Sequence, residues 1–280
     1  MALTVATNTG ALMAQAAASS VNKEMEISME RLSTGKRINS AADDAAGVAI
    51  ASRLSSEIRG TNQAIRNTMD AQALIDTAEG AQLEVVNLLQ RMRELAVQSS
   101  NSTNSTADRT ALDAEFQALE SEIDRVGSTT TWAGISLLDA ASTLNFQVGS
   151  RSSTADTISV TIQAIHSTGM GSTTTATTAS LGLDTYTKST AAITALDTAI
   201  ASVNKQRGAL GAVSNRLDAT VANLTNISNN LEAGKGRIED ADFAAETTNL
   251  AKTQILQQAS TAMLAQANAA KQNVLSLLQG

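Results

Sequence analysis

The residues able to support acid–base or nucleophilic chemistry are few, and their spacing does not bring them together. His166 is the only histidine, so we expect neither a catalytic triad nor a histidine cluster. The absence of cysteine excludes disulfides, thiolate metal sites and thiol nucleophiles. Asp43 and Asp44 resemble an acid–base pair, but adjacent helical residues point about 100° apart. Carboxylates at a helix start near Ser40 are the simpler interpretation, and we predict no enzymatic activity.

Binding motifs are also missing. The spacing of a phosphate-binding loop occurs nowhere, and Gly35 is better explained as the end of a first helix. A net charge of −7 and a pI near 4.8 disfavour a nucleic-acid partner. No window approaches the ~20 apolar residues of a membrane span. The first twenty residues lack the basic region of a Sec signal peptide, so export would need another route. We predict no cofactor, metal, nucleic-acid or membrane partner.

The composition indicates long, thin helical bundles. Proline is absent, aromatic residues make up 2% of the chain, and hydrophobic residues make up 42%. Small and aliphatic apolar residues suit helix–helix seams better than a thick globular core. Without proline, the strongest helix terminator is missing.

Two helices are predicted in the first half. The first spans about 41–100, with an apolar face formed by Ile50, Leu54, Ile58, Ile65, Met69, Ile75 and Ala78, and then by the heptad Val85, Leu89, Met92 and Ala96. Residues 99–107 have the composition of a loop. Apolar spacing then resumes at Leu112, Phe116, Leu119, Ile123 and Val126. A short loop between two such helices predicts an antiparallel pair.

The second half contains the strongest periodicity. Six apolar residues fall seven apart: Leu196, Val203, Leu210, Leu217, Leu224 and Leu231. We expect Leu217 and Leu224 to pack against the seam of residues 85–96.

The middle of the chain is rich in Ser, Thr and Gly. Apolar residues alternate at Leu144, Phe146 and Val148, and again at Ile158, Val160, Ile162 and Ala164, which predicts a β-hairpin. Residues 167–180 are expected to form an exposed loop. His166 then lies at the hairpin's end, as a surface or turn residue.

Both ends carry apolar stripes with no nearby element to cover them. The residues that we assign to assembly are Met25, Leu32, Leu256, Met263, Val274 and Leu277. Such surfaces are typical of chains that are completed only in an assembly. Met25, Met29, Met69, Met92 and Met263 lie on apolar stripes and are interpreted as gap-filling seam residues.

Several ordered motifs at both ends resemble bacterial flagellin. They are Arg31–Gly35, Arg37–Ala41, Asp43–Gly47, Leu89–Gln98, Glu122–Val126 and Trp132–Gly134 near the front, and Leu210–Val213, Arg237–Asp242, Gln254–Ala259 and Gln272–Leu278 near the end. The chain departs from the family at Lys271, where many members have proline, and in ending Gln279-Gly280 rather than in arginine. Its middle is too short for large outer domains.

The resemblance implies a secreted structural subunit of the flagellar filament, with a hook–filament junction protein as the alternative. A secreted enzyme with helical export arms is a third hypothesis, but the middle offers no convergent titratable groups. The implied fold is mainly α, a long antiparallel helical bundle or coiled coil formed by the two halves, with a small β-hairpin region between them. The implied domains are 1–44 with 236–280 as an inner tube, 45–140 with 188–235 as the filament wall, and 141–187 as a short variable region.

The resemblance also implies partners. They are further copies of the chain, the flagellar type III export apparatus, a secretion chaperone, the filament cap, hook-associated proteins and host innate immune receptors. By resemblance, Arg91, Leu95 and Glu115 form the surface bound by the animal Toll-like receptor for flagellin, and residues 30–51, with Asp43 at a sensitive position, form the epitope sensed by plants. From the residues alone, Arg91, Arg93 and Glu94 form a solvated or ion-paired helix face.

Overall fold

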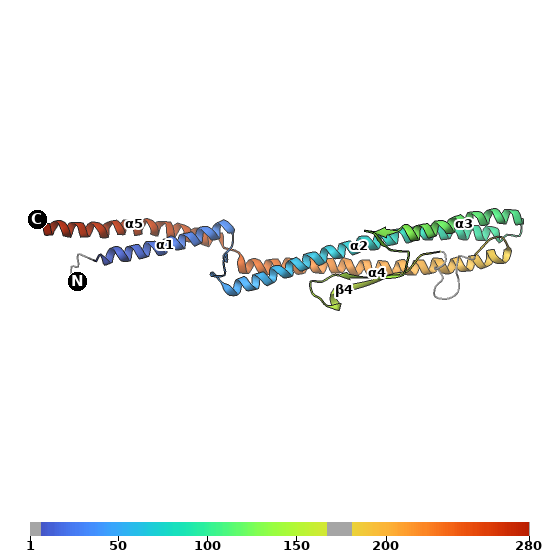
Figure 1. Ribbon diagram of the computed structural model, residues 1–280, viewed down its shortest axis with the longest axis horizontal. Helices are drawn as coiled ribbons and strands as arrows, with labels where there is room; N and C mark the ends of the chain where they lie inside the picture. The colour runs from blue at the N-terminus through green and yellow to red at the C-terminus, as the bar shows by residue number, and fades with distance from the viewer. Residues whose placement is uncertain (1–6, 167–180, 280) are drawn as a thin grey trace. The chain divides into compact units, whose positions relative to one another are not determined.

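The computed structural model describes the backbone of residues 7–166 and 181–279, with side chains up to residue 270. The helices are α1 (Thr9–Thr34), α2 (Ala45–Ser99), α3 (Thr106–Thr129), α4 (Tyr186–Glu239) and α5 (Phe243–Gln279). The strands are β1 (Thr131–Trp132), β2 (Ile135–Ser136), β3 (Ser142–Gln147) and β4 (Thr157–Ile162). Figure 1 shows this order along the chain, which confirms the mainly helical prediction with a small hairpin region.

The contacts divide the chain into two compact units. The terminal unit contains the described residues up to Glu57 and from Asn230 onward, and the central unit contains Ile58–Asn229. Helices α2 and α4 contribute residues to both. Each unit is described by itself below.

In the central unit, α2 and α4 are antiparallel, and polar side chains mark their register. Ser228 donates a 2.8 Å hydrogen bond to Asn62, Gln72 donates to Asp218, and Arg93 Nε lies 2.6 Å from Asp197. Leu217, which precedes Asp218, therefore lies beside the turn of α2 around Gln72. The Val85–Ala96 seam lies more than a dozen residues further along, about 20 Å of helix. The prediction that Leu217 and Leu224 pack against that seam is wrong, because heptad periodicity identifies a face but not a register.

The α4 side of this seam is large and aliphatic. Leu196, Val203, Leu210, Leu217 and Leu224 are buried, while Leu231 is half-buried.

The α2 side is built from smaller residues than the sequence suggests. Two rows with heptad spacing are buried: Ala64, Ala71, Ala78, Val85, Met92 and Ser99, and Thr61, Thr68, Ile75, Gln82, Leu89 and Ala96. Ile50 and Met69 are instead exposed, so their predicted place on the buried face is wrong. Small side chains on one helix accommodate the leucines of the other, which allows close packing.

Two of the buried polar residues of α2 differ in how they are satisfied. Thr68 Oγ1 donates 2.7 Å to the Ala64 carbonyl within its own helix. Among the described residues, neither polar atom of the Gln82 amide has a hydrogen-bond partner, although the side chain is fully buried. An unpaired buried amide costs about 1–3 kcal/mol. The hydrophobic seam therefore carries a local penalty at Gln82.

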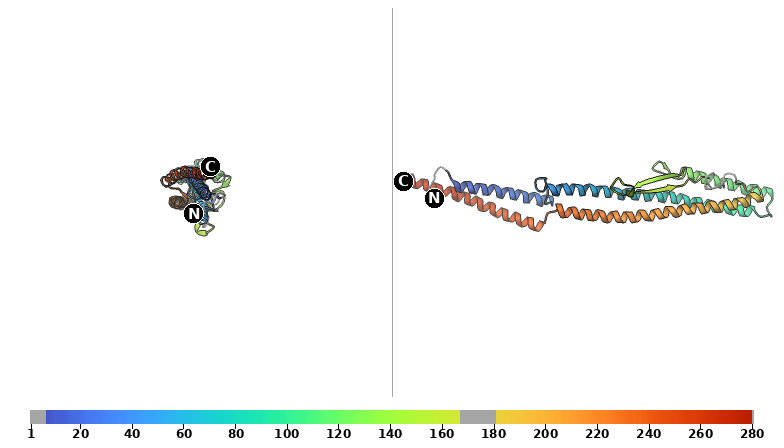
Figure 2. Two further views of the ribbon diagram at one scale, coloured as in Figure 1. Left: turned by 90° about the vertical axis from the view of Figure 1, so that its left-hand side faces the viewer. Right: turned by 90° about the horizontal axis from the view of Figure 1, so that it is seen from below.

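Helix α3 and the hairpin complete the central core. A capping box between Ser105 and Asp108 starts α3, which buries Phe116 and Ile123. Strands β3 and β4 are antiparallel, and Ile158, Val160 and Ile162 of β4 are buried in the core that includes helical residues. Figures 1 and 2 show the hairpin lying along the helices of this unit.

A second, tighter ribbon joins β1 to β2, which the sequence reading missed. Ala133 and Gly134 both have positive φ, 49° and 83°, as a two-residue type I′ hairpin turn requires. Gly127 of α3 is constrained by a close contact, because an added Cβ would collide with the Ile165 carbonyl oxygen.

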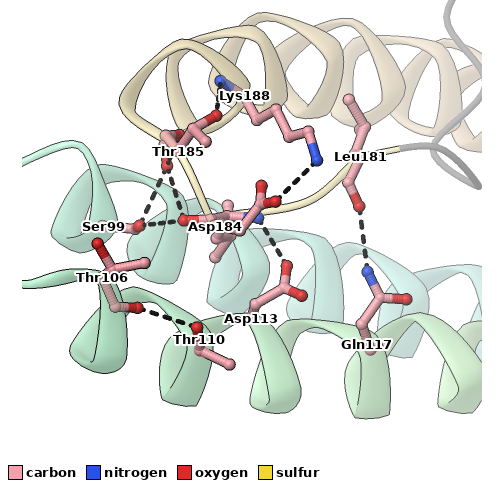
Figure 3. A network of polar contacts seen from close by, with 11 residues as sticks. Ser99, Thr106, Thr110, Asp113, Gln117, Leu181, Asp184, Thr185 and Lys188 are labelled. Carbon is pink, nitrogen blue, oxygen red and sulfur yellow. Dashed lines mark hydrogen bonds and ion pairs between the residues drawn. The ribbon is translucent and has the colours of Figure 1, made fainter.

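A polar network joins the ends of α2 and α4 to α3 (Figure 3). Ser99 Oγ donates 2.7 Å to the Leu183 carbonyl, and Ser189 Oγ lies 3.0 Å from Ser99 Oγ. The Leu183 amide donates 2.6 Å to Asp113, and Gln117 donates 3.1 Å to the Leu181 carbonyl. The network fixes the chain where it enters α4, with the Leu183 side chain buried.

In the terminal unit, α1 and α5 are antiparallel. Asn8 caps α1 by accepting from the Ala11 amide at 3.1 Å, and its Nδ2 donates 3.1 Å to the Ala267 carbonyl of α5. Further along, Gln257 donates 2.8 Å to Asn22. Gly35, with φ 72°, ends α1 in the left-handed conformation, as predicted from the sequence.

The buried position of Leu217 gives a test of the central seam. We expect Leu217→Asp to lower the free energy of unfolding by about 3–5 kcal/mol, because it leaves a charge without a partner in a closed apolar contact. Denaturant unfolding followed by helical circular dichroism measures the loss. Ala219→Asp, at an exposed position of the same helix, is the matched control and should change stability by less than about 0.5 kcal/mol. Equal stability of the two variants would contradict the placement.

Candidate assembly surface

The seam between α1 and α5 is lined by small and polar residues. Its fully buried members are Ala14, Ser28, Glu246 and Thr253. The half-buried positions around them continue the 4-3 spacing: Ala11, Ala18, Val21, Met25 and Leu32 on α1, and Leu250, Gln257, Ser260, Leu264 and Ala267 on α5. The fully buried positions of this seam therefore hold no large apolar side chain.

Besides the half-buried apolar residues of the seam, other large apolar side chains of these helices are exposed. The exposed ones are Leu12, Met13 and Met29 on α1, and Phe243, Ile255, Leu256 and Met263 on α5. We call these seven residues the outward apolar surface. Such a concentration of exposed apolar side chains is typical of a protein–protein contact.

The residues assigned to assembly from the sequence fall into three groups. Met25 and Leu32 are half-buried at the α1–α5 seam, and Leu256 and Met263 belong to the outward apolar surface. Val274 and Leu277 lie outside the residues whose side chains are described. Sequence reasoning missed Leu12, Met13, Phe243 and Ile255. One sequence signal separates the two sides of α5, because its residues form two rows at heptad spacing. Positions 246, 253 and 260 make up one row, and positions 256 and 263 make up the other.

Ion pairs and backbone bonds close the base of this helix pair. Arg31 Nη1 lies 3.8 Å from the carboxylate of Glu246, and Lys36 Nζ lies 3.1 Å from that of Glu239. The Arg37 amide donates 2.6 Å to the Glu239 carbonyl, and the Ala241 amide donates 3.0 Å to the Gly35 carbonyl. These contacts fasten the end of α1 to the connection between α4 and α5.

The two adjacent aspartates have separate structural roles before α2. Asp44 accepts a 2.8 Å hydrogen bond from the Gly47 amide and so caps the helix. One carboxylate oxygen of Asp43 accepts from the amides of Ser40 at 2.8 Å and Asn39 at 3.0 Å. These backbone hydrogen bonds, that from Ser40 above all, hold the pKa of Asp43 below its ordinary value. The helix-start interpretation is correct for Asp44, whereas Asp43 organises the preceding turn.

On the central unit, Arg91 joins α2 to α3 at the surface. Its Nη2 lies 2.8 Å from Glu115 of α3, and its Nη1 lies 3.0 Å from Glu94, one turn along α2. These hydrogen bonds, first that to Glu115 and then that to Glu94, raise the pKa of Arg91. All three side chains are about half exposed or more, so water screens the pairs and each contributes little stability. The ion-paired interpretation of Arg91 and Glu94 holds.

Leu95 does not belong to that exposed patch. It is 1% exposed and lies in the central core with Phe116 and Ile123 of α3. The prediction that Leu95 presents an apolar contact beside Arg91 is therefore wrong. Arg91 and Leu95 are one helical turn apart. Leu95 lies on the part of α2 that α3 covers, whereas Arg91 lies outside that part.

His166 is a partly exposed turn residue. Its Nε2 lies 2.7 Å from the Asp139 carbonyl and 3.2 Å from the Asp139 carboxylate. Across the described side chains, no group of three or more His, Asp or Glu residues is arranged to hold a metal ion. None of the described helices is long and apolar enough to cross a membrane.

Family models match both helical halves of the chain. The bacterial flagellin N-terminal helical region matches residues 5–143, and the bacterial flagellin C-terminal helical region matches residues 193–278. The chain is 47% identical over 255 residues to a flagellin of Halalkalibacterium halodurans, covering 90% of each chain. It is 38% identical over 283 residues to the flagellar filament 33 kDa core protein of Treponema phagedenis, covering 97% of this chain and 98% of the relative.

One solved structure shares the arrangement of helices. A putative flagellar hook-associated protein from Vibrio parahaemolyticus has a TM-score of 0.62 at 15% identity, covering 71% of this chain and all of that one. At that identity the likeness concerns the fold alone. Bacillus cereus flagellin is 33% identical, with a TM-score of 0.48, covering 61% of this chain and 94% of that one.

The turn around Asp43 gives a pH prediction. We expect the Asp43 carboxyl to titrate below the ~3.9 of a free aspartate, because its charged form accepts two backbone hydrogen bonds. A depressed folded pKa contributes stability above the unfolded pKa, and this contribution is lost as pH falls through the folded pKa, below about pH 4. NMR titration of the Asp43 carboxyl in assembled chain, whose terminal helices are folded, measures the shift against an unfolded peptide of residues 36–48. Equal titration midpoints in the two samples would rule out the proposed hydrogen bonding of the Asp43 carboxylate in this turn.

Proposed function

This chain belongs to the bacterial flagellin family and is a structural subunit of the flagellar filament, and we propose that it polymerises through the outward apolar surface of α1 and α5. The identity of 47% over 90% of each chain with a flagellin carries the family assignment. The observation behind the polymerisation surface is that seven large apolar side chains of α1 and α5 are exposed.

The energetics of the helix pair favour assembly as its source of stability. Burying a large apolar side chain contributes about 1.5–3 kcal/mol, and seven such side chains remain exposed in the single subunit. The buried members of the seam are Ala14, Ser28, Glu246 and Thr253, while its larger apolar members, such as Met25 and Leu264, are only half-buried. We therefore propose that residues 1–44 and 236–280 are disordered in the free monomer and become helical on polymerisation.

The division into an inner tube, a wall and a variable region is part of this proposal. Residues 1–44 with 236–280 would form the tube, 45–140 with 188–235 the wall, and 141–187 the variable region. These boundaries lie near two breaks between helices, one between α1 and α2 and the other between α4 and α5. An isolated antiparallel β-bridge between the backbones of Lys36 and Asp240 joins the two breaks.

The other roles proposed here rest on family membership. The chain acts as a structural protein without a cofactor and is not an enzyme. Export follows the flagellar type III route, with a secretion chaperone, to an extracellular filament that meets the cap and hook-associated proteins. A hook–filament junction role is the alternative, and long filaments grown from this chain alone would exclude it.

Truncation tests whether the end of α5 is needed for polymerisation. Removing Asn268–Gly280 is expected to abolish seeded filament growth, because it deletes the end of α5 while leaving the central unit intact. Electron microscopy measures the filaments, and the unfolding midpoint of the central helices should stay unchanged as the control. Filament growth at the full-length rate would contradict a role of the end of α5 in assembly.

A second partner proposal concerns the Arg91–Glu115 pair. We propose that a host Toll-like receptor for flagellin binds this charged ridge between α2 and α3, with Asp43 in a separate epitope sensed by plants. Arg91 offers a planar donor group at about half exposure, and Glu115 beside it offers an acceptor. Leu95 is excluded from the contact because it is buried.

Reporter cells test this contact directly. Arg91→Ala is expected to lower receptor activation by monomer about tenfold or more, as loss of a central arginine anchor does. Arg93→Ala is the matched control, since Arg93 is an equally exposed arginine of α2 that pairs with α4 instead. Equal receptor activation by the two variants and by the unchanged monomer would contradict the proposal.

A further inference from the structure

The methionines among the described residues differ in exposure. Met92 is fully buried in the central core and Met25 is half-buried at the α1–α5 seam. Met13 is 75% exposed, Met263 67% and Met29 46%, and all three belong to the outward apolar surface. Within the subunit, Met29 and Met263 therefore do not fill a seam, contrary to the interpretation from the sequence.

The chain offers an oxidant no thiol, because it has no cysteine. Methionine is then the side chain whose two-electron oxidation can be reversed by an enzyme. A peroxide transfers one oxygen atom to the thioether sulfur, which becomes a sulfoxide, and the peroxide is reduced to water. The carbon–sulfur bonds stay intact. Reaction needs an accessible sulfur, and the exposures above separate reactive from protected positions.

We propose that Met13, Met29 and Met263 form an oxidation site at which peroxides reversibly block assembly of this chain. Oxidation replaces a flexible apolar side chain by a polar one in the surface that must be buried between subunits. A sulfoxide buried without a hydrogen-bond donor disfavours the contact. The proposal rests on the proposed function, because it requires the outward apolar surface to be the subunit contact.

The position of these residues explains why the subunit itself would tolerate oxidation. The α1–α5 seam runs through Ala14, Ser28, Glu246 and Thr253, and none of the three exposed methionines belongs to it. Oxidation therefore changes the surface and leaves the packing inside the subunit unchanged. In a filament the same contact would shield the thioethers, so monomers would oxidise faster than assembled subunits.

The experiment exposes purified full-length monomer to hydrogen peroxide and then measures seeded elongation. Because the terminal segments are proposed to be disordered in the free monomer, mass mapping should find sulfoxide at Met13, Met25, Met29 and Met263 and at the exposed Met69, but not at the buried Met92. We expect elongation to fall about tenfold or more, equivalent to about 1.4 kcal/mol per subunit contact. Treatment with methionine sulfoxide reductases of both epimer specificities and a thiol reductant should restore elongation.

Matched variants assign the effect to the surface. In a Met25→Leu background, which by itself should stay sensitive, the triple variant Met13→Leu, Met29→Leu and Met263→Leu should elongate normally after peroxide, because leucine keeps the surface apolar without a sulfur. Met69→Leu removes an exposed methionine of α2 and should stay as sensitive as the unchanged chain. Oxidised chain that elongates at the untreated rate, or a triple variant that is equally sensitive, would overturn the proposal.

An experiment without peroxide tests the proposed polymerisation surface separately from the oxidation site. Met263→Asp places a charge on the outward apolar surface and should block elongation. Normal elongation of that variant would overturn the polymerisation surface, and the oxidation site with it. A blocked Met263→Asp variant beside a fully active oxidised chain would overturn the oxidation site alone.

Discussion

The central unit depends on the close approach of α2 and α4, in which small residues of one helix receive large residues of the other. Ala64, Ala71 and Ala78 supply room on α2, and Leu210, Leu217 and Leu224 fill it from α4. Because α2 presents so little side-chain volume there, the leucines bury almost completely. Helix α3 and the hairpin then complete a core that these two helices establish.

The terminal unit uses the opposite arrangement. The buried residues of its α1–α5 seam are small or polar, whereas Phe243, Ile255 and Met263 are exposed. Apolar side chains exposed in this way gain free energy only when another surface covers them. The same amino-acid types therefore fill the core of one unit and remain at the surface of the other. Exposure of thioethers follows from this arrangement, because methionine suits an adaptable contact.

Polar groups set the details that apolar packing leaves open. The side-chain pairs Asn62–Ser228, Gln72–Asp218 and Arg93–Asp197 mark one register between α2 and α4. The Ser99–Ser189 network fixes the end of the bundle, and the Asp43 turn leads the chain into α2. Gln82 is the exception, since its buried amide finds no partner among the described residues. A buried polar group left without a partner lowers stability at this position of the seam.

The sequence by itself determined the family, the helical class and the hairpin. It also determined the buried heptad of α4, because an apolar residue, mostly leucine, at every seventh position is an unambiguous signal. It did not identify the buried face of α2, where Ala, Thr and Gln occupy the seam and Met69 lies outside it. Nor did it determine the register, since every shift of seven residues buries the same faces. Only the tertiary structure decided that Leu95 is buried, because that depends on where α3 covers α2. It also decided which side of α5 meets α1, because two rows on one helix compete and the partner helix selects between them.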